Sequence, residues 1–301
     1  MILQKIKRKI YKLFHPPVGE ILMLHRVVEN RSLLDVNRQM EITPQFLEKT
    51  LQIYQRKGYQ FVSLDEVHEI VSKQMRPKQK FVCFTFDDGY ADNYELAYPI
   101  FKKYNCPFAI YVTTAFPDGK ATMWWYVLEA ILKDNDTLVL GDGTHLSALT
   151  IEEKNEAFDN VRSKVFNAKG EDMERFVGQL LNKYTFSFST LAEQLALCWD
   201  QIEELSFYSL CTIGSHTVTH SPLTNLSTKE LEKELRGSKS TIEKHINKPV
   251  VHFAYPYGIY NQKVTEFVKK AGYKTATLAN GGKVRLEEQS EFKIKRISLV
   301  E

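Results

Sequence analysis

Short apolar segments alternate with amphipathic helical segments along most of this chain of 301 residues. The apolar segments have the length of buried strands, and the segments between them repeat apolar residues at helical spacing. The strand-like segments lie near residues 20–27, 60–63, 81–84, 107–113, 210–213, 250–255, 273–278 and 292–299. The helical segments lie near 44–57, 64–71, 91–104, 227–246 and 261–271. This alternation is typical of an α/β barrel.

The alternation is interrupted between about residues 118 and 208. Trp124 and Trp125 begin a predicted helix there, and residues 150–205 are predicted to be mostly helical with charged faces. A chain of this length with 43% hydrophobic residues can bury a full core. We therefore expect one barrel domain at residues 18–301 with a mostly helical insertion at about 118–208.

Two adjacent carboxylates, Asp87 and Asp88, follow the apolar segment at residues 81–84. Adjacent side chains that leave a strand diverge, so one carboxylate can bind a metal while the other reaches a water held by that metal. An Asp-Asp-Gly sequence is also typical of an ordinary turn, because Asp and Gly suit turn conformations. The pair alone therefore leaves a catalytic site and a simple turn as alternatives.

Two histidines supply further ligand candidates. His216 and His220 follow the apolar segment at residues 210–213, and one helical turn would bring both imidazoles to the same face. A solvated helical turn is the alternative for this pair taken alone. Because the Asp and His segments both follow predicted strands, we expect one Asp and two His to form a three-ligand metal site with open positions.

Three motifs now stand in order along the chain: Thr85-Phe86-Asp87-Asp88-Gly89, His216-x-x-x-His220, and Pro256-Tyr257-Gly258 after a strand. Together they resemble the polysaccharide deacetylase family, also called carbohydrate esterase family four or the NodB-homology domain. The resemblance covers about residues 22–299 outside the insertion. It implies a distorted (β/α) barrel of about seven strands, similar to a TIM barrel.

The resemblance also implies roles for individual residues. In this family the first Asp of the pair is the general base, which corresponds to Asp87. The second Asp binds the metal with the two His, which implies Asp88, His216 and His220 as ligands. The backbone N–H of the third-motif Tyr helps hold the oxyanion, which implies that role for Tyr257.

The chain departs from the better-known members at two positions. Ala254 stands where they carry an Arg that orients the catalytic Asp, and the late strand contains Arg296 but not their acid His. His25, near the end of the first predicted strand, resembles the rearranged branch of biofilm exopolysaccharide de-N-acetylases, whose acid His is N-terminal. We therefore predict His25 as the general acid, the alternative being a strand-end His held in loop structure. We further hypothesise that Arg296 replaces the missing Arg beside Asp87.

These residues would suit amide hydrolysis, which needs a polarised carbonyl, an activated water and a proton for the departing nitrogen. Imidazole and carboxylate ligands favour Zn, with Fe, Co and Ni as alternatives. We predict a metal-dependent de-N-acetylase of an N-acetylhexosamine unit in bacterial surface polysaccharide or lipopolysaccharide biosynthesis. The alternatives are an O-acetyl esterase on a carbohydrate, a non-catalytic homologue that binds sugar or metal, and hydrolysis of another C–N bond.

Aromatic residues are candidates for sugar binding. Trp124 and Trp125 in the insertion, with Tyr255 and Tyr257 of the third motif, could contact a sugar ring. Aromatic residues at the start of an amphipathic helix also commonly anchor that helix to the core, which is the alternative for the two Trp.

The net charge of +3 does not indicate a nucleic-acid partner. Residues 1–17 form a basic amphipathic segment, and residues 1–14 could lie on an anionic membrane surface or pack on the barrel as a short helix. The segment does not have the apolar region of a signal peptide. We therefore expect a cytoplasmic protein, at the inner face of the membrane if the segment binds there, with a lipid- or nucleotide-linked sugar as substrate.

Overall fold

The structure, a computed structural model, describes residues 14–168 and 173–301. The predicted amphipathic segment and its membrane contact therefore lie outside the described residues, apart from residues 14–17. None of the described helices combines the length and the apolar composition needed to cross a bilayer.

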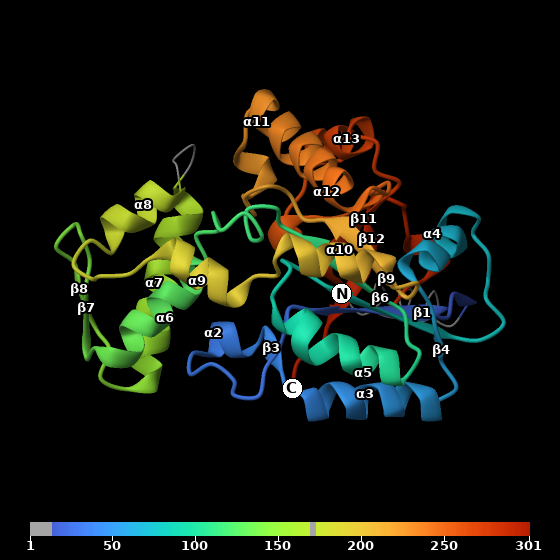
Figure 1. The fold of residues 1–301 in the computed structure, drawn as a ribbon, viewed down its shortest axis with the longest axis horizontal. Helices are drawn as coiled ribbons and strands as arrows, with labels where there is room; N and C mark the ends of the chain where they lie inside the picture. Colours follow the sequence, from blue (N-terminus) through green and yellow to red (C-terminus); the bar gives the residue numbers. More distant parts are fainter. Residues whose placement is uncertain (1–13, 169–172) are drawn as a thin grey trace, which may run out of the picture.

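Seven parallel strands close into a barrel (Figure 1). They are β1 (Gly19–Leu24), β5 (Phe81–Phe86), β6 (Phe108–Val112), β9 (Cys211–Ser215), β10 (His252–Ala254), β11 (Thr275–Gly281) and β12 (Ile294–Ser298). Their order is β1, β12, β11, β10, β9, β6 and β5, and the pairing of β1 with β5 closes the ring. A short strand, β4 (Gln60–Phe61), pairs with the first residues of β5. The predicted barrel of about seven strands is confirmed.

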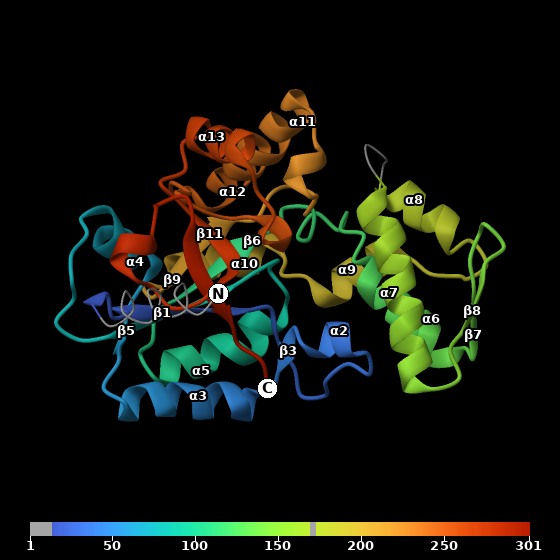
Figure 2. The same cartoon turned by 180° about the vertical axis from the view of Figure 1, so that it is seen from behind.

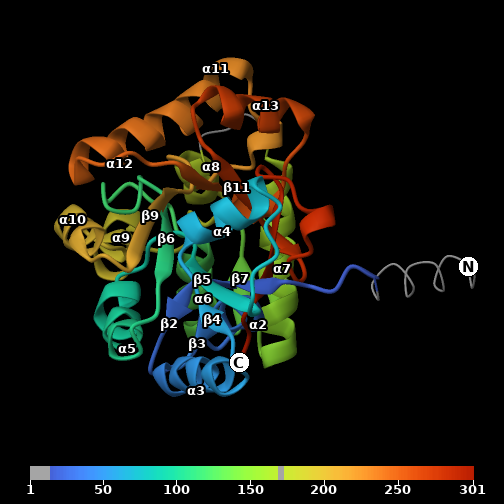
Figure 3. The ribbon, with the colours of Figure 1, turned by 90° about the vertical axis from the view of Figure 1, so that its right-hand side faces the viewer.

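Helices surround the outer face of the barrel (Figure 3). They are α3 (Pro44–Arg56), α5 (Tyr98–Lys103), α10 (Trp199–Phe207), α11 (Thr228–Glu232), α12 (Ser238–Ile246) and α13 (Gln262–Lys270). Two π-helical turns, η1 (Asn93–Ala97) and η3 (Lys233–Gly237), lead directly into α5 and α12. The side chain of Ser227 accepts a bond from the N–H of Glu230, so the helix that the sequence predicts there begins with a capping box.

Strand β5 shows how the sequence directs side chains to the two faces of the barrel wall. Phe81 and Cys83 belong to the hydrophobic cluster inside the barrel, whereas Phe84 and Phe86 pack beneath the surrounding helices. Successive side chains of a strand point to opposite faces. The same alternation directs Asp87, just beyond the strand, toward the interior.

Helix α4 (Leu64–Ser72) closes the end of the barrel at which the strands begin. Its buried residues Leu64, Val67 and Ile70 belong to the same cluster as the barrel interior. Oδ1 of Asp65 in its first turn lies 3.0 Å from Nε2 of His252, the first residue of β10. The opposite end, where the strands finish, remains available for a site.

Between β6 and β9 the chain forms a lobe beside the barrel (Figure 2). Its elements are α6 (Trp124–Asp134), β7 (Thr137–Val139), β8 (His145–Ser147), α7 (Ile151–Asn167), α8 (Met173–Leu180) and α9 (Phe188–Leu195). Strands β7 and β8 form an antiparallel hairpin, which the pattern of this segment did not predict. Leu128 and Leu132 of α6 pack with Phe158 and Val161 of α7, so the lobe has its own hydrophobic cluster.

The shorter elements of the chain are β2 (Arg26–Val27), α2 (Asp35–Arg38), β3 (Glu41–Ile42), η2 (Leu223–Asn225), η4 (Pro256–Gly258) and η5 (Leu286–Glu288).

The segment that follows β1 is hydrogen-bonded to this lobe. The buried carboxylate of Glu129 in α6 accepts hydrogen bonds from the backbone N–H groups of Leu33 and Leu34 and from the Asn37 side chain. These bonds hold the segment around α2 against the lobe.

Candidate active site

Asp87 and Asp88 directly follow β5, at the end of the barrel opposite α4. Both are buried, with 3% of each residue exposed. Asp88 has a φ of 76° and Gly89 a φ of 93°, so the chain turns sharply at this point. The segment is therefore a turn that also directs two carboxylates in different directions.

The Asp87 carboxylate is paired with Arg296 of β12 inside the barrel. Nη1 of Arg296 donates to Oδ1 of Asp87 and Nη2 donates to Oδ2, both at 2.6 Å. The same guanidinium donates to the hydroxyl of Thr85 and, through Nε, to the carbonyl of Leu278. Arg296 is fully buried, and its four bonds hold the guanidinium plane in one orientation. The structure thus brings together Asp87 and the Arg that the sequence suggested for it.

This pairing determines the charge of Asp87. Burial alone would raise the pKa of the carboxyl group, but the Arg296 guanidinium and, more weakly, His216 lower it to about 2. Asp87 is therefore a carboxylate at neutral pH.

His216 and His220 lie in the loop after β9, not in the helical turn that their spacing predicts. Thr217 has a φ of 74° and His220 a φ of 58°, values that a right-handed helix does not allow. The predicted helical turn is therefore wrong, because residues in the left-handed region bend the loop back on itself. The imidazoles nevertheless meet, with ring centroids 4.8 Å apart.

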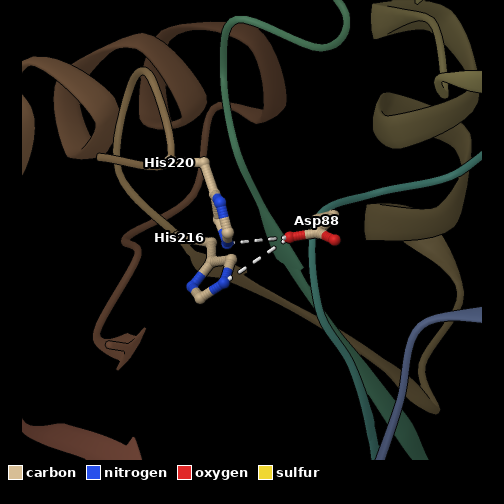
Figure 4. A group of neighbouring side chains, drawn as sticks. All are labelled: Asp88, His216 and His220. Atoms are coloured by element: carbon tan, nitrogen blue, oxygen red, sulfur yellow. Dashed lines mark ion pairs between the residues drawn. The ribbon is translucent and has the colours of Figure 1, made fainter. Parts of the chain in front are cut away.

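Both imidazoles face Asp88 (Figure 4). Nε2 of His216 lies 3.6 Å and Nε2 of His220 lies 3.4 Å from Oδ1 of Asp88. Nδ1 of His216 lies 2.8 Å from the carbonyl of Ala254, so Nδ1 carries the proton in this bond and Nε2 keeps its lone pair. Burial lowers the pKa of both imidazoles to about 4 and raises the pKa of Asp88.

This group fits a metal ion. One ligand atom from each of Asp88, His216 and His220 lies within 4.8 Å of the others. Oδ1 of Asp88 is buried and has no hydrogen-bond partner among the described residues, so it is an acceptor that a cation could satisfy. Neutral imidazoles and a carboxylate are the ligand types of three-ligand zinc sites.

A cavity of about 350 Å³ opens over these residues. His25, which follows β1, lines it together with Asp87 and Asp88. Trp124, Trp125 and Tyr257 also line it. The structure therefore brings most of the residues predicted from the sequence to one cavity.

Comparison with known proteins decides the family. The model of the polysaccharide deacetylase family matches residues 74–276, well over half of the chain. The chain belongs to the polysaccharide deacetylase family. It is therefore a carbohydrate deacetylase, a hydrolase, and the resemblance seen in its motifs is confirmed.

Relatives of this polysaccharide deacetylase cover most of its length. It is 22% identical over 277 residues to YxkH of Bacillus subtilis (strain 168), provisionally named a polysaccharide deacetylase, with 92% of this chain and 70% of YxkH matched. Deacetylase PplD of Streptococcus pyogenes, solved in complex with acetate, matches with a TM-score of 0.64 and 21% identity, over 94% of this chain and 93% of PplD. IcaB from Ammonifex degensii matches with a TM-score of 0.61 and 17% identity, over 95% and 93%. At these identities the solved structures show that the fold is shared.

The position of His25 in this deacetylase follows from β1. Leu24 pairs with Phe86 in the neighbouring strand, and the N–H of Asp87 donates to the carbonyl of Leu24, so His25 lies next to the Asp pair. The Asn93 side chain donates to the carbonyl of His25 at 2.9 Å. The backbone of His25 is thereby held while its side chain lines the cavity.

The two third-motif tyrosines occupy different environments. Tyr257 has a φ of 59°, and its ring packs against His220 with centroids 4.5 Å apart. Tyr255 is fully buried in the core, and its hydroxyl donates to the carbonyl of Phe292. Tyr255 does not line the cavity, because its side chain packs in the hydrophobic cluster beneath the surrounding helices.

Helix α7 also contributes to the cavity, which the motifs did not predict. Phe158, Arg162 and Phe166 line the cavity from the lobe, and Phe166 packs against Tyr257 at 5.0 Å. The signal was present, because these residues are spaced four apart and therefore share one face of a helix. These residues are distant from the three motifs along the chain, so the sequence did not show that they lie at the same cavity.

Proposed function

We propose that this polysaccharide deacetylase is a metal-dependent de-N-acetylase of an N-acetylhexosamine unit, acting in the biosynthesis of bacterial surface polysaccharide or lipopolysaccharide. The observation that carries the proposal is one cavity lined by the Asp88/His216/His220 group, by the carboxylate that Arg296 holds, and by His25. These are the parts that amide hydrolysis requires.

In this proposal, Asp88 and Nε2 of His216 and His220 hold the divalent cation. Zn suits the two imidazoles and the carboxylate best, and Fe, Co and Ni share the same ligand preferences. When bound, the cation supplies Lewis acidity and lowers the pKa of the attacking water. The buried and unpartnered Oδ1 of Asp88 supports this assignment.

Asp87 is proposed as the general base. Each of its oxygens accepts one bond from Arg296, which leaves a further lone pair for the proton of the attacking water. The bidentate contact fixes the carboxylate plane, so Arg296 acts by positioning Asp87. A base held in one orientation is already placed when the water arrives, which lowers the entropic cost of the step.

His25 is proposed as the general acid that protonates the departing amine. An amine leaves poorly without a proton, so this step matters for an amide. The backbone N–H of Tyr257 is proposed to donate to the developing oxyanion, a contribution of about 3 kcal/mol for one donor. Both residues line the cavity beside Asp87, which supports these roles.

The sugar is proposed to bind between the aromatic side chains of the cavity. Trp124 and Trp125 line it, and the volume of about 350 Å³ is at the small end of ligand pockets, which suits a single sugar unit. Arg162 is the only Arg or Lys among the lining residues that the structure describes. It also pairs with Asp159 at 3.2 Å, but this ion pair is exposed, so the guanidinium could exchange the carboxylate for the phosphate of a lipid- or nucleotide-bound sugar.

The direct test is acetate release by metal-loaded protein from nucleotide-linked, lipid-linked and oligomeric N-acetylhexosamines. We expect release that requires the metal and is abolished in Asp87→Asn. No release from any substrate, with metal bound to the wild-type chain, would contradict the proposal and favour a non-catalytic homologue.

A further inference from the structure

Glu234 supports the loop that carries both histidines, although it belongs to a different element. It lies in η3, between α11 and α12, and only 5% of the residue is exposed. Its Oε2 atom accepts hydrogen bonds from the N–H groups of Val218 and Thr219, at 2.8 and 2.9 Å. Its Oε1 atom accepts a bond from the Thr219 hydroxyl at 2.8 Å. All three bonds reach the two central residues of the loop.

The loop needs this support because its backbone is unusual. Thr217 and His220, on either side of Val218 and Thr219, both have positive φ values, which are unfavourable for residues with a side chain. The loop forms no regular helix or strand that would hold it. Within the loop, the N–H of His220 donates to the Thr217 hydroxyl at 3.0 Å, and partners outside the loop add to this one bond.

The loop is held on two sides. The carbonyls of Thr217 and Val218 accept bonds from the N–H groups of Thr114 and Ala115, which follow β6. The N–H groups on the other side of the loop are those that donate to Glu234. The carboxylate thus completes the set of contacts that fixes the separation of His216 and His220.

A second connection joins the same turn of helix to the residue before His216. The Ser215 hydroxyl donates to the hydroxyl of Ser238 at 2.8 Å, and Ser238 donates to the backbone carbonyl of Glu234 at 2.6 Å. Ser215 and Ser238 are fully buried. The helix that carries Glu234 therefore contacts the start and the middle of the loop.

We propose that Glu234 is a positioning residue that sets the geometry of His216 and His220 and thereby the affinity of the site for its metal. This inference rests on the metal site of the proposed function. Groups that orient metal ligands from behind commonly change metal affinity by about 10–100-fold when removed. A purely structural Glu234 would instead contribute to folding and leave metal affinity unchanged.

The test is the dissociation constant for Zn, measured on the full chain by competition with a chelating indicator, together with the thermal midpoint of the metal-free protein. We expect Glu234→Ala to bind Zn about tenfold more weakly or worse. Glu234→Gln should stay close to wild type, because its amide oxygen can still accept both backbone N–H bonds.

Glu129→Ala is the matched control. Glu129 is also buried and also accepts bonds from two backbone N–H groups, but these belong to the loop near α2. We expect this variant to lower the thermal midpoint and to leave Zn affinity unchanged. Equal weakening of Zn binding in both variants would mean that general destabilisation is the cause.

A folded Glu234→Ala protein with wild-type Zn affinity overturns the inference. If Glu234→Ala does not fold, Glu234→Asp replaces it, because the shorter carboxylate cannot keep all three bonds; wild-type Zn affinity in Glu234→Asp then overturns the inference instead. If the wild-type chain itself binds no metal, the proposed metal site fails, which is a separate outcome.

Discussion

Arg296 and Asp87 form a bidentate pair inside the barrel, with two hydrogen bonds of 2.6 Å. The pair joins β12 to the end of β5, although 209 positions separate the two residues along the chain. Ala254 of β10 stands where the better-known family members carry an Arg. A guanidinium from another strand therefore lies beside the carboxylate that we propose as the general base, so the missing third-motif Arg does not by itself argue for an inactive chain.

Replacing Arg296 by Met should affect stability and catalysis together. Asp87 would remain as a buried carboxylate without its partner, which costs about 3–5 kcal/mol of the free energy of unfolding. Urea unfolding measures this loss. The double variant Arg296→Met/Asp87→Asn should recover part of it, because no buried charge remains unpaired, yet should stay inactive. A single variant as stable as wild type would contradict this account of the pair.

The two adjacent Asp residues should respond differently to the same substitution. Asp87→Asn should lose acetate release while keeping bound metal, because Asp87 is not a ligand in the proposed site. Asp88→Asn should lose both, since a carbonyl oxygen is a poorer ligand than a carboxylate oxygen. Elemental analysis after dialysis measures the metal content. Equal metal content in the two variants would remove Asp88 from the ligand set.

His25→Ala should separate amide from ester hydrolysis. An alcohol leaves more easily than an amine, so loss of the acid should lower kcat by about 10²–10⁴-fold for an N-acetyl substrate and much less for an O-acetyl one. His245→Ala is a suitable control, because His245 stacks on Trp199 at the surface and does not line the cavity. Similar losses on both substrates would argue against His25 as the general acid.

Arg162→Gln should change substrate preference. If Arg162 contacts a phosphate, KM for nucleotide- or lipid-linked substrates should rise about tenfold, which corresponds to about 1.4 kcal/mol, while KM for neutral oligomers should not change. Lys164→Gln is the control: it removes the same charge from the same helix and also breaks one ion pair, with Asp142, but Lys164 does not line this cavity. A rise in KM for neutral oligomers as well would indicate a steric effect in place of charge recognition.

Local sequence predicted the elements well where their pattern was strong. The strands and helices of the barrel follow from apolar periodicity and capping, and the Ser227 capping box is present in the structure. The hairpin of β7 and β8 was missed, because strands of three residues are too short to show a period. The helical turn predicted for His216 and His220 was wrong, because the surrounding contacts stabilise left-handed residues that spacing alone does not reveal.

The fold class, the family and the motif residues at the ends of β5 and β9 could be predicted without the structure. These features depend on patterns that span only a few neighbouring residues, so they can be recognised from local sequence. Four other features became visible in the folded chain: Arg296 contacts Asp87, Arg162 of α7 lines the cavity, Tyr255 lies in the core, and Glu234 accepts bonds from the histidine loop. Each of these contacts joins residues on different elements, and closure of the barrel together with packing of the lobe brings them together.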